Sequence, residues 1–203
     1  MSEEMKMKPQ AKNIIRALGG QIRMSEALSR GISRYQLYKM RDEGVIETIS
    51  RGYYRLMELP SLSDPDLVPV SLRFPHAVIC LVSALAYHHL TTQIPHVVSL
   101  AVAQNARIPQ LAYPPIQAYR FSKASFAAGI QTHDLDGVKI HIFDPEKTLA
   151  DCFKFRNRLG MDIILESLQL YKSRMPLKLD ALLNYARICR VEKMITPYLE
   201  TLL

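Results

Sequence analysis

The sequence lacks the features that define several large classes of protein. No window holds the roughly eighteen consecutive apolar residues of a membrane helix, and the opening MSEEMKMKPQ has no apolar core of a secretion signal. The three cysteines are odd in number and show no CxxC spacing, so neither a disulfide framework nor a zinc site is predicted. With 48% apolar and 22% charged residues, we expect a folded cytoplasmic protein that does not associate with membranes.

The sequence also lacks the short motifs of common enzymes. GxSxG, GxxxxGK[ST] and GxGxxG are all absent, so no catalytic residue and no cofactor is predicted. His88 and His89 are adjacent on a predicted helix, so their side chains point about 100° apart. We therefore do not predict that His88, His89 and His96 form a metal site. Asp134 and Asp136 resemble a nucleotidyltransferase metal pair, but the upstream Gly-Ser loop is missing and turn chemistry explains Asp136. A magnesium-dependent nuclease that uses these two aspartates is the enzymatic alternative.

Positive charge is concentrated in the first quarter of the chain. Residues 1–56 contain 11 Lys/Arg and 6 Asp/Glu, which gives 11 − 6 = +5, whereas residues 57–203 contain 15 and 13, which gives +2. This distribution predicts a polyanionic partner for the N-terminal quarter. The alternative is that a basic surface only keeps the protein soluble.

Two helices are predicted before residue 32. The stretch KPQAKNIIRALGG predicts a helix of about ten residues that ends at Gly19–Gly20. Ser25 is then expected to cap a short helix whose Ala27 and Leu28 face inward. Gly31 is expected to end that helix in a left-handed turn.

A third helix and a hairpin follow at once. Ser33 and Gln36 fit a capping box, which places the start of the helix at Arg34, and Leu37 and Met40 have the spacing to pack inward. Beyond this helix, VIETIS and YYRL are β-prone runs separated by a tight Arg-Gly turn. Three helices followed by a two-stranded hairpin predict a winged helix-turn-helix.

The residue types of this unit are those that contact DNA. The N-terminal part of the third helix is expected to enter the major groove, and the hairpin tip is expected to contact the neighbouring backbone or minor groove. The predicted DNA-binding residues are Ser33, Arg34, Tyr35, Gln36, Tyr38, Lys39, Arg51 and Tyr53. The alternative is a protein-docking winged helix in which the tyrosines are partly buried.

The remainder of the chain predicts a second, larger domain. Four prolines fall in residues 57–75, so residues 1–58 are predicted to be the DNA-binding domain, 59–75 a linker with one turn of helix around 66–72, and 76–203 a mixed α+β domain. The apolar run AVICLVSALAYHHL predicts the central buried helix of that domain. HVVSLAVAQ and IQAYRFS predict strands, and IQTHDLDGVKIHIFD predicts a hairpin around Asp136–Gly137.

The C-terminal part of the second domain is predicted to be helical. Asp144 and Pro145 are the expected cap and first position of a helix that ends at Gly160, and three more helices are expected at about 161–172, 178–189 and 191–202. The predicted fold class is therefore α+β: an N-terminal winged helix-turn-helix, then a mixed α+β domain with a helical C-terminal tail.

The helix after Asp144 is predicted to present a basic face. Leu149, Cys152 and Phe153 have the spacing to pack inward. The predicted exposed cations are Lys147, Lys154, Arg156 and Arg158. They form either an ordinary solvated helix face or an interaction surface for an acidic protein or a nucleic acid.

Taken together, these segments resemble the AbiEi family of antitoxins and transcriptional regulators. The resemblance rests on GISRYQLYKMRDEGVIETISRGYYRL, DLVPVSLRFPHAVICLVSALAYHHLTTQIPH, DGVKIHIFDPEKTLADCFKFRNRLG and YARICRVEKMITPYLE. The pairing of SRGYYRL with PEKTLADCFKFR is fairly specific to this family.

The resemblance implies a function in a type IV toxin-antitoxin system linked to abortive phage infection. Such proteins bind inverted repeats in double-stranded operator DNA through an N-terminal winged helix and repress their own operon. Their C-terminal domain opposes a cognate nucleotidyltransferase-like toxin without an obligate stable complex. By this resemblance, residues 33–39 and 51–53 match the DNA-binding motif, and residues 147–158 fall in the C-terminal motif.

A different class of function is a stand-alone, ligand-sensing transcriptional regulator. Family members without a toxin partner exist, and the α+β domain could then hold a small molecule near Tyr87 to His96. An effect of a metabolite on DNA affinity would distinguish this alternative from an antitoxin.

Overall fold

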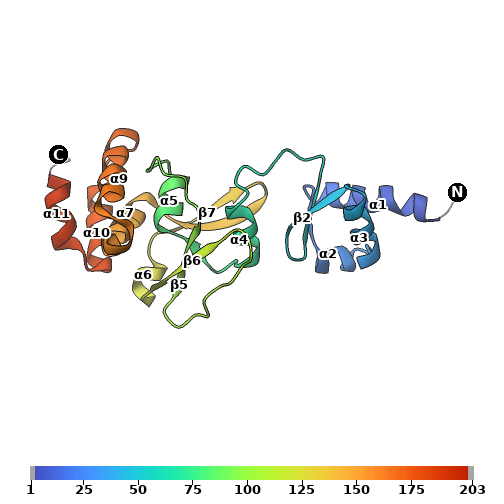
Figure 1. Cartoon of the computed structure of the whole chain (residues 1–203), viewed down its shortest axis with the longest axis horizontal. Helices are drawn as coiled ribbons and strands as arrows, with labels where there is room; N and C mark the ends of the chain where they lie inside the picture. The colour runs from blue at the N-terminus through green and yellow to red at the C-terminus, as the bar shows by residue number, and fades with distance from the viewer. Residues whose placement is uncertain (1–2, 201–203) are drawn as a thin grey trace. The chain divides into compact units, whose positions relative to one another are not determined.

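The chain forms two compact units. The computed structural model describes the backbone of residues 3–200 and the side chains of residues 10–200. The first unit runs to Arg73 and includes Leu135–Val138, and the second unit contains Phe74–Asp134 and the chain from Lys139 onward. N-terminal helices and strands in blue and the helical C-terminal part in orange and red can be followed in Figure 1.

The first unit combines helices with a small antiparallel sheet. The strand order is β1-β3-β2, and Ile22 of β1 and Thr48 of β2 both face Tyr54 of β3. The elements are α1 (Glu3–Ala17), β1 (Gln21–Arg23), α2 (Met24–Ser29), α3 (Arg34–Asp42), β2 (Ile46–Ser50), β3 (Tyr53–Leu56) and α4 (Leu67–Arg73). The predicted hairpin of β2 and β3 is confirmed, and β1 adds a third strand that the sequence did not predict. This order of elements is consistent with a winged helix-turn-helix.

The start of α2 differs from the prediction. The residue before the helix is Arg23, the last residue of β1, and its side chain makes no capping hydrogen bond. Ser25 therefore lies inside the helix instead of capping it, because the pairing of β1 with β3 carries the chain directly into the first turn. Ala27 is buried as predicted, but Leu28 is 40% exposed and the inward orientation predicted for it is wrong.

The core of the first unit lies between its helices and its sheet. Leu37 and Met40 of α3 are buried, which confirms the inward face predicted for this helix. Their main buried neighbours come from α1, β1 and β3 and include Ile15, Ile22, Tyr54 and Leu56. The core under α3 fixes which side chains of that helix face outward.

The second unit is built on a mixed sheet with the strand order β6-β5-β4-β8-β7. β4 is parallel to β8 and antiparallel to β5, and β5 is parallel to β6. The strands are β4 (Val78–Ile79), β5 (Val98–Ala103), β6 (Ile116–Phe121), β7 (Ile130–Leu135) and β8 (Val138–Phe143). The predicted mixed α+β class is confirmed at this level.

Helices cover this sheet and extend beyond it. They are α5 (Leu81–Tyr87), α6 (Lys123–Ala127), α7 (Pro145–Lys154), α8 (Arg156–Leu159), α9 (Met161–Arg174), α10 (Leu179–Cys189) and α11 (Glu192–Glu200). α7 packs against α5, α9, α10 and α11, so it is the central helix of the unit. Within residues 3–200, no helix has both the length and the apolar character needed to cross a membrane.

Two predicted helices of the second unit are divided in the structure. The run from 77 to 90 is not one helix: Val78–Ile79 form β4, and α5 begins only at Leu81. Ile79 pairs with Leu100 and Ile142, so the first part of this apolar run forms a strand instead of a helix. The helix predicted from Pro145 to Gly160 is interrupted at Phe155, between α7 and α8.

Candidate nucleic-acid interface

The N-terminus of α3 is fixed by a reciprocal pair of hydrogen bonds. Ser33 Oγ accepts from the backbone N–H of Gln36 at 3.2 Å, and Gln36 Oε1 accepts from the backbone N–H of Ser33 at 2.7 Å. The capping box and the helix start at Arg34 are thus confirmed. The amide oxygen of Gln36 accepts this hydrogen bond, and the NH₂ of the same side chain is a donor.

The outer face of α3 is basic and aromatic. Arg34 is exposed, and Tyr35 and Tyr38 are 64% and 42% exposed, while Leu37 lies on the buried face. Lys39 Nζ lies 5.7 Å from the centre of the Tyr35 ring, within the range of a cation–π contact. The first turn of the helix contains no acidic residue. The exposed tyrosines of α3 argue against an arrangement in which these rings are buried.

The acidic residue within α3, Asp42, is the last residue of the helix. Arg41 Nη2 forms an ion pair with Asp42 Oδ1 at 2.8 Å, and this hydrogen-bonded partner raises the pKa of Arg41. The guanidinium of Arg41 also lies 5.2 Å from the Tyr38 ring. Asp42 is eight residues after Arg34, a distance of about 12 Å along the helix axis. The first turn of α3 therefore carries the positive charge of Arg34 with no acidic side chain of the helix beside it.

The turn between β2 and β3 carries a second group of residues. Arg51 is exposed at this turn, and Gly52 adopts a φ of 77°, the left-handed conformation that a tight hairpin turn requires. Tyr53 is half-buried, and Arg23 Nε donates a hydrogen bond to its hydroxyl. The guanidinium of Arg23 also lies 4.7 Å from the Tyr53 ring.

Arg23 is a basic residue beside this turn that sequence reasoning missed. It is exposed, faces Tyr53 across the β1–β3 pair, and is followed by Met24, whose N–H donates to the carbonyl of Gly52 at 2.8 Å. A three-residue strand is too short to show a period in sequence, so its pairing could not be predicted. The pairing places a second arginine next to the turn that carries Arg51.

Lys147 does not belong to the basic face predicted for the C-terminal motif. Its side chain is 0% exposed and forms an ion pair with Asp151, one helical turn later on α7. Its Nζ lies 4.2 Å and 5.0 Å from the ring centres of Phe143 and Phe121. The prediction of an exposed Lys147 is therefore wrong, because Asp151 and two aromatic rings provide a buried site for its charge.

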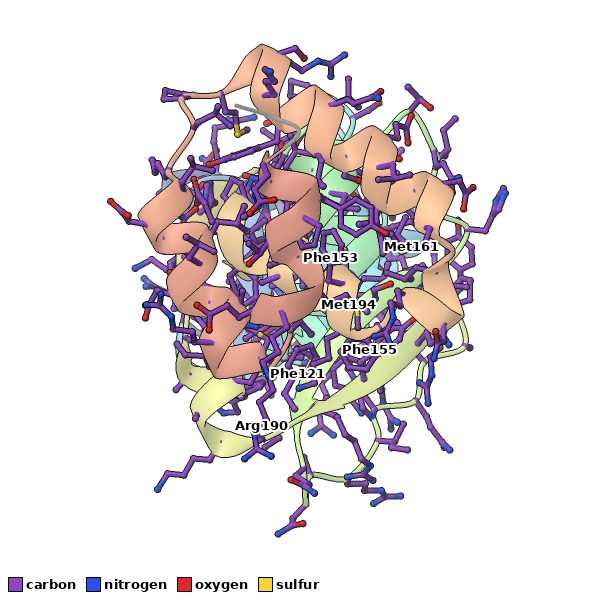
Figure 2. The ribbon with its side chains drawn as sticks, turned by 90° about the vertical axis from the view of Figure 1, so that its left-hand side faces the viewer. Phe121, Phe153, Phe155, Met161, Arg190 and Met194 are labelled. Atoms are coloured by element: carbon purple, nitrogen blue, oxygen red, sulfur yellow. The ribbon has the colours of Figure 1, made fainter. Side chains whose placement is uncertain are left out.

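The other three cations of the motif remain at least partly accessible. Lys154 is half-buried with its Nζ 5.5 Å from the Phe121 ring, Arg156 Nη1 donates to the carbonyl of Phe153 at 3.2 Å, and Arg158 is exposed. Figure 2 shows where Phe121, Phe153 and Phe155 lie in this part of the second unit. Leu149, Cys152 and Phe153 are fully buried, as their spacing predicted.

Acidic residues of the motif join α7 to the helices that follow it. Asp144 Oδ1 accepts from the Lys147 N–H and Oδ2 from the Tyr185 hydroxyl, both at 2.7 Å, and Tyr171 donates to Glu146 Oε1 at 2.7 Å. Burial raises the pKa of Asp144 against the lowering effect of its two donors. Asp144 therefore caps α7, as predicted, and links it to α10, while Glu146 links α7 to α9.

His88 and Asp136, two of the residues considered as metal ligands, have structural roles. His88 is buried, its Nε2 lies 2.8 Å from the carbonyl oxygen of Phe143, and burial lowers its pKa. Asp136 and Gly137 adopt φ values of 53° and 80°, the left-handed pair that a two-residue hairpin turn requires. Among the described side chains, no group of three or more His, Cys, Asp or Glu could hold a metal ion.

The N-terminal part of the chain is similar to a known protein family. Residues 10–56 match the family model of the transcriptional regulator, AbiEi antitoxin. This match covers α3 and the β2–β3 turn, and it confirms the predicted family resemblance for residues 10–56. No curated protein matches the chain.

A solved structure shares the fold at low sequence identity. The chain is similar to the crystal structure of the RV2827C protein from Mycobacterium tuberculosis, with a TM-score of 0.53 and 12% identity. The similarity covers 90% of this chain and 75% of that chain. At this identity it shows a common fold and nothing about function.

Proposed function

We propose that this chain is a cytoplasmic, DNA-binding transcriptional autorepressor and an antitoxin that counteracts a cognate nucleotidyltransferase-like toxin. The match of residues 10–56 to a family of transcriptional regulators supports the first part of this proposal. The observation that carries it lies inside the matched segment: a capped α3 whose outer face bears the exposed Arg34 and Tyr35 and the half-buried Lys39.

In the proposed complex, the first unit binds operator DNA as a winged helix-turn-helix. α3 enters the major groove, where Arg34, Lys39 and the NH₂ of Gln36 donate to base edges or phosphates. The β2–β3 turn is the wing, and its Arg51 contacts the phosphate backbone. Phosphate contacts supply most of the affinity and a few base contacts supply the specificity. Two copies of the chain bind an inverted repeat.

The second unit is proposed to provide the antitoxin activity without an obligate stable complex. Lys154, Arg156 and Arg158 are the accessible cations of the C-terminal motif, and they supply a surface for an acidic partner. Lys147 has no place in this surface because it is buried. Lys147 instead contributes to the packing of α7, the helix that positions this surface.

Charge reversal in α3 tests the DNA-binding proposal. The full chain is titrated against DNA from upstream of its own gene by fluorescence anisotropy at several salt concentrations. We expect the logarithm of the affinity to fall linearly with the logarithm of salt concentration. Arg34→Glu with Lys39→Glu should weaken binding by about 100-fold or more, because two attractive phosphate or base contacts become repulsive.

A matched control keeps this test specific. Lys172 is an exposed cation of α9 in the second unit, and Lys172→Glu should bind the same DNA as the wild type does. Circular dichroism should show that all variants are folded. Unchanged DNA affinity in the α3 variant, or affinity that does not depend on salt, would remove α3 from the interface.

Co-expression tests the antitoxin half of the proposal separately. The chain is expressed with a nucleotidyltransferase-like protein encoded next to it, and growth is measured. Rescue of growth by the wild type and by the α3 charge-reversal variant would assign antitoxin activity to the second unit. Growth arrest in the presence of wild-type chain would contradict the antitoxin role and leave DNA binding intact.

If the chain were a ligand-sensing regulator, its ligand would be expected near Tyr87 to His96. Several polar groups of this segment already have partners: Thr91 Oγ1 donates to Glu166 Oε2 at 2.9 Å, and Thr92 N–H donates to Glu166 Oε1 at 3.1 Å. These hydrogen bonds join the segment to α9. No contact in this segment favours a ligand over the structural role.

A further inference from the structure

An open pocket lies in the second unit where α10 ends and α11 begins. Its volume is about 500 Å³, which falls within the range of small-molecule sites. It is lined by Arg187, Arg190, Val191, Glu192, Lys193 and Met194. All six lie within one short stretch of chain, so the helix–helix junction alone forms the pocket.

The charge of the lining is positive. Three cations and one carboxylate give 3 − 1 = +2, and Arg187 Nε is already paired with Glu192 Oε1 at 2.8 Å. Arg190 and Lys193 are both exposed, and within residues 10–200 neither side chain forms an ion pair or a hydrogen bond. Two cations are therefore available to an anionic ligand.

The backbone of Arg190 makes its position unusual. It follows α10 with φ 61° and ψ 40°, a left-handed conformation in which glycine is the common residue. A side chain is strained at such a position, so the helix stop itself does not account for an arginine there. What the arginine adds to this turn is a guanidinium at the pocket.

The pocket also has an apolar side. Val191 is buried, and Met194 is partly buried against the core cluster of the second unit, which contains Phe153. In Figure 2, Met194 lies toward Phe153 and Phe155, whereas Arg190 lies at the periphery. A methionine at an apolar surface adapts to flat ligand groups of different shapes. The lining thus combines a basic rim with an apolar inner side.

We propose that this pocket binds the polyphosphate of a nucleotide, with Arg190 and Lys193 on the phosphates and Met194 against the base or ribose. Adjacent phosphates supply the negative charge that the rim lacks, and charge-assisted hydrogen bonds from guanidinium to phosphate are among the stronger ones in proteins. The same chemistry is offered by a free nucleoside triphosphate and by the triphosphorylated end of an RNA strand. The proposal does not depend on DNA binding by the first unit.

Calorimetry with the full chain tests the site and separates the two sources. ATP should bind at least about tenfold more tightly than adenosine, because adenosine has no group for the two cations. A short RNA with a 5′-triphosphate is compared with the same RNA ending in a hydroxyl. Tighter binding of ATP identifies a free nucleotide as the ligand, and tighter binding of the triphosphorylated RNA identifies a strand end. Failure of both to bind at millimolar concentration, or equal binding of ATP and adenosine, overturns the proposal.

Arg190→Gly is the decisive variant because glycine suits the left-handed backbone. It should keep the melting temperature of the wild type and weaken ATP binding by about tenfold or more. Lys193→Gln should weaken binding in the same direction, and Lys172→Gln on α9 should have no effect. If the glycine variant fails to fold, Arg190→Asn, which also tolerates this conformation, replaces it. Wild-type ATP affinity in the folded Arg190 variant contradicts the proposal, while its operator affinity, measured in parallel, reports separately on the first unit.

Discussion

At the scale of single residues, the buried pair of Lys147 and Asp151 is expected to have a large effect on stability. Both side chains are 0% exposed, and Asp151 Oδ1 also accepts a hydrogen bond from Cys189 Sγ at 3.1 Å. Removing one member leaves the other charge buried without its partner. Lys147→Met should therefore lower the free energy of unfolding by about 3–5 kcal/mol.

A double variant separates the effect of the ion pair on stability from the effect of side-chain volume. Lys147→Met with Asp151→Leu should recover much of this loss, because two apolar side chains replace two charges that balance each other. Urea unfolding followed by circular dichroism measures both variants. Lys154→Met, on the same helix but half-buried, is the control and should change stability by less than about 1 kcal/mol. Equal destabilisation in the single and double variants would show that the ion pair is not the cause.

His88 is expected to make the stability of the second unit depend on pH. Burial lowers its pKa below the ordinary 6.5, and His133 adds to this, while the Phe143 carbonyl, Asp144 and Glu146 act in the opposite direction. As the pH falls through 6.5, the unfolded chain therefore takes up a proton before the folded chain does. A lowered histidine pKa contributes stability that is present above 6.5 and is lost as the pH falls further.

Urea unfolding between about pH 7.5 and pH 5 measures this effect. His88→Gln keeps an Nε2 donor for the Phe143 carbonyl but does not titrate, so its stability should fall less over this range. His96→Gln changes an exposed histidine and should keep the wild-type pH profile. A profile in the His88 variant that matches the wild type would assign the pH dependence to other groups.

Lys147 also shows what residue types alone could not predict. Lysines are rarely buried without a partner, so a basic helix was expected to present this one to solvent. Asp151 stands four residues later, the spacing that brings two side chains together on one face of a helix. That spacing is visible in the sequence, but the two aromatic rings that enclose Nζ come from β6 and β8, and only the fold places them there.

At the scale of elements, the cap of α3 can be separated from its contact with DNA. Ser33→Ala removes the acceptor for the Gln36 N–H and should cost about 1 kcal/mol of stability. Ser33→Asp keeps an acceptor and also places negative charge at the helix N-terminus, so stability should be retained. The same carboxylate would face the phosphates in the proposed complex, so operator affinity should fall in the aspartate variant despite its intact helix.

Thermal unfolding and anisotropy on the same protein samples measure the two effects. Loss of stability with alanine, and loss of DNA affinity without loss of stability with aspartate, is the expected pattern. Operator affinity in the aspartate variant equal to that of the wild type would place Ser33 outside the interface while leaving its capping role intact.

Elements with strong local signals were predicted well, and elements defined by distant partners were not. The capping box at Ser33 and the Asp144–Pro145 start of α7 satisfy backbone groups within a few residues, so the sequence contains the whole signal. β1 and β4 exist because of strands far along the chain: Arg23 pairs with Tyr53, and Ile79 with Ile142. A run of apolar residues does not by itself specify whether it will form a helix or pair with a neighbouring strand.

At the scale of the whole molecule, the family match and the fold match cover different extents of the chain. The family model matches residues 10–56, and the similarity to the solved structure covers 90% of the chain at 12% identity. The candidate interface on α3 was accessible to sequence reasoning because its cap, charge and periodicity are local. Arg23 joins the candidate interface through strand pairing, and the pocket at Arg190 arises where two helices meet, so neither has a sequence signature of its own.

The positions of the cysteines allow the rate of opening of the second unit to be measured by thiol labelling. Cys80, Cys152 and Cys189 are all free, buried and in the second unit. Burial raises the pKa of Cys80 and Cys152 well above their ordinary value and that of Cys189 to about 11, which suppresses the reactive thiolate. An alkylating reagent should therefore add mass to the native chain only at the rate at which the second unit opens, whatever the first unit does. Intact-mass spectrometry over time reads that rate directly, and prompt labelling of all three thiols under native conditions would contradict it.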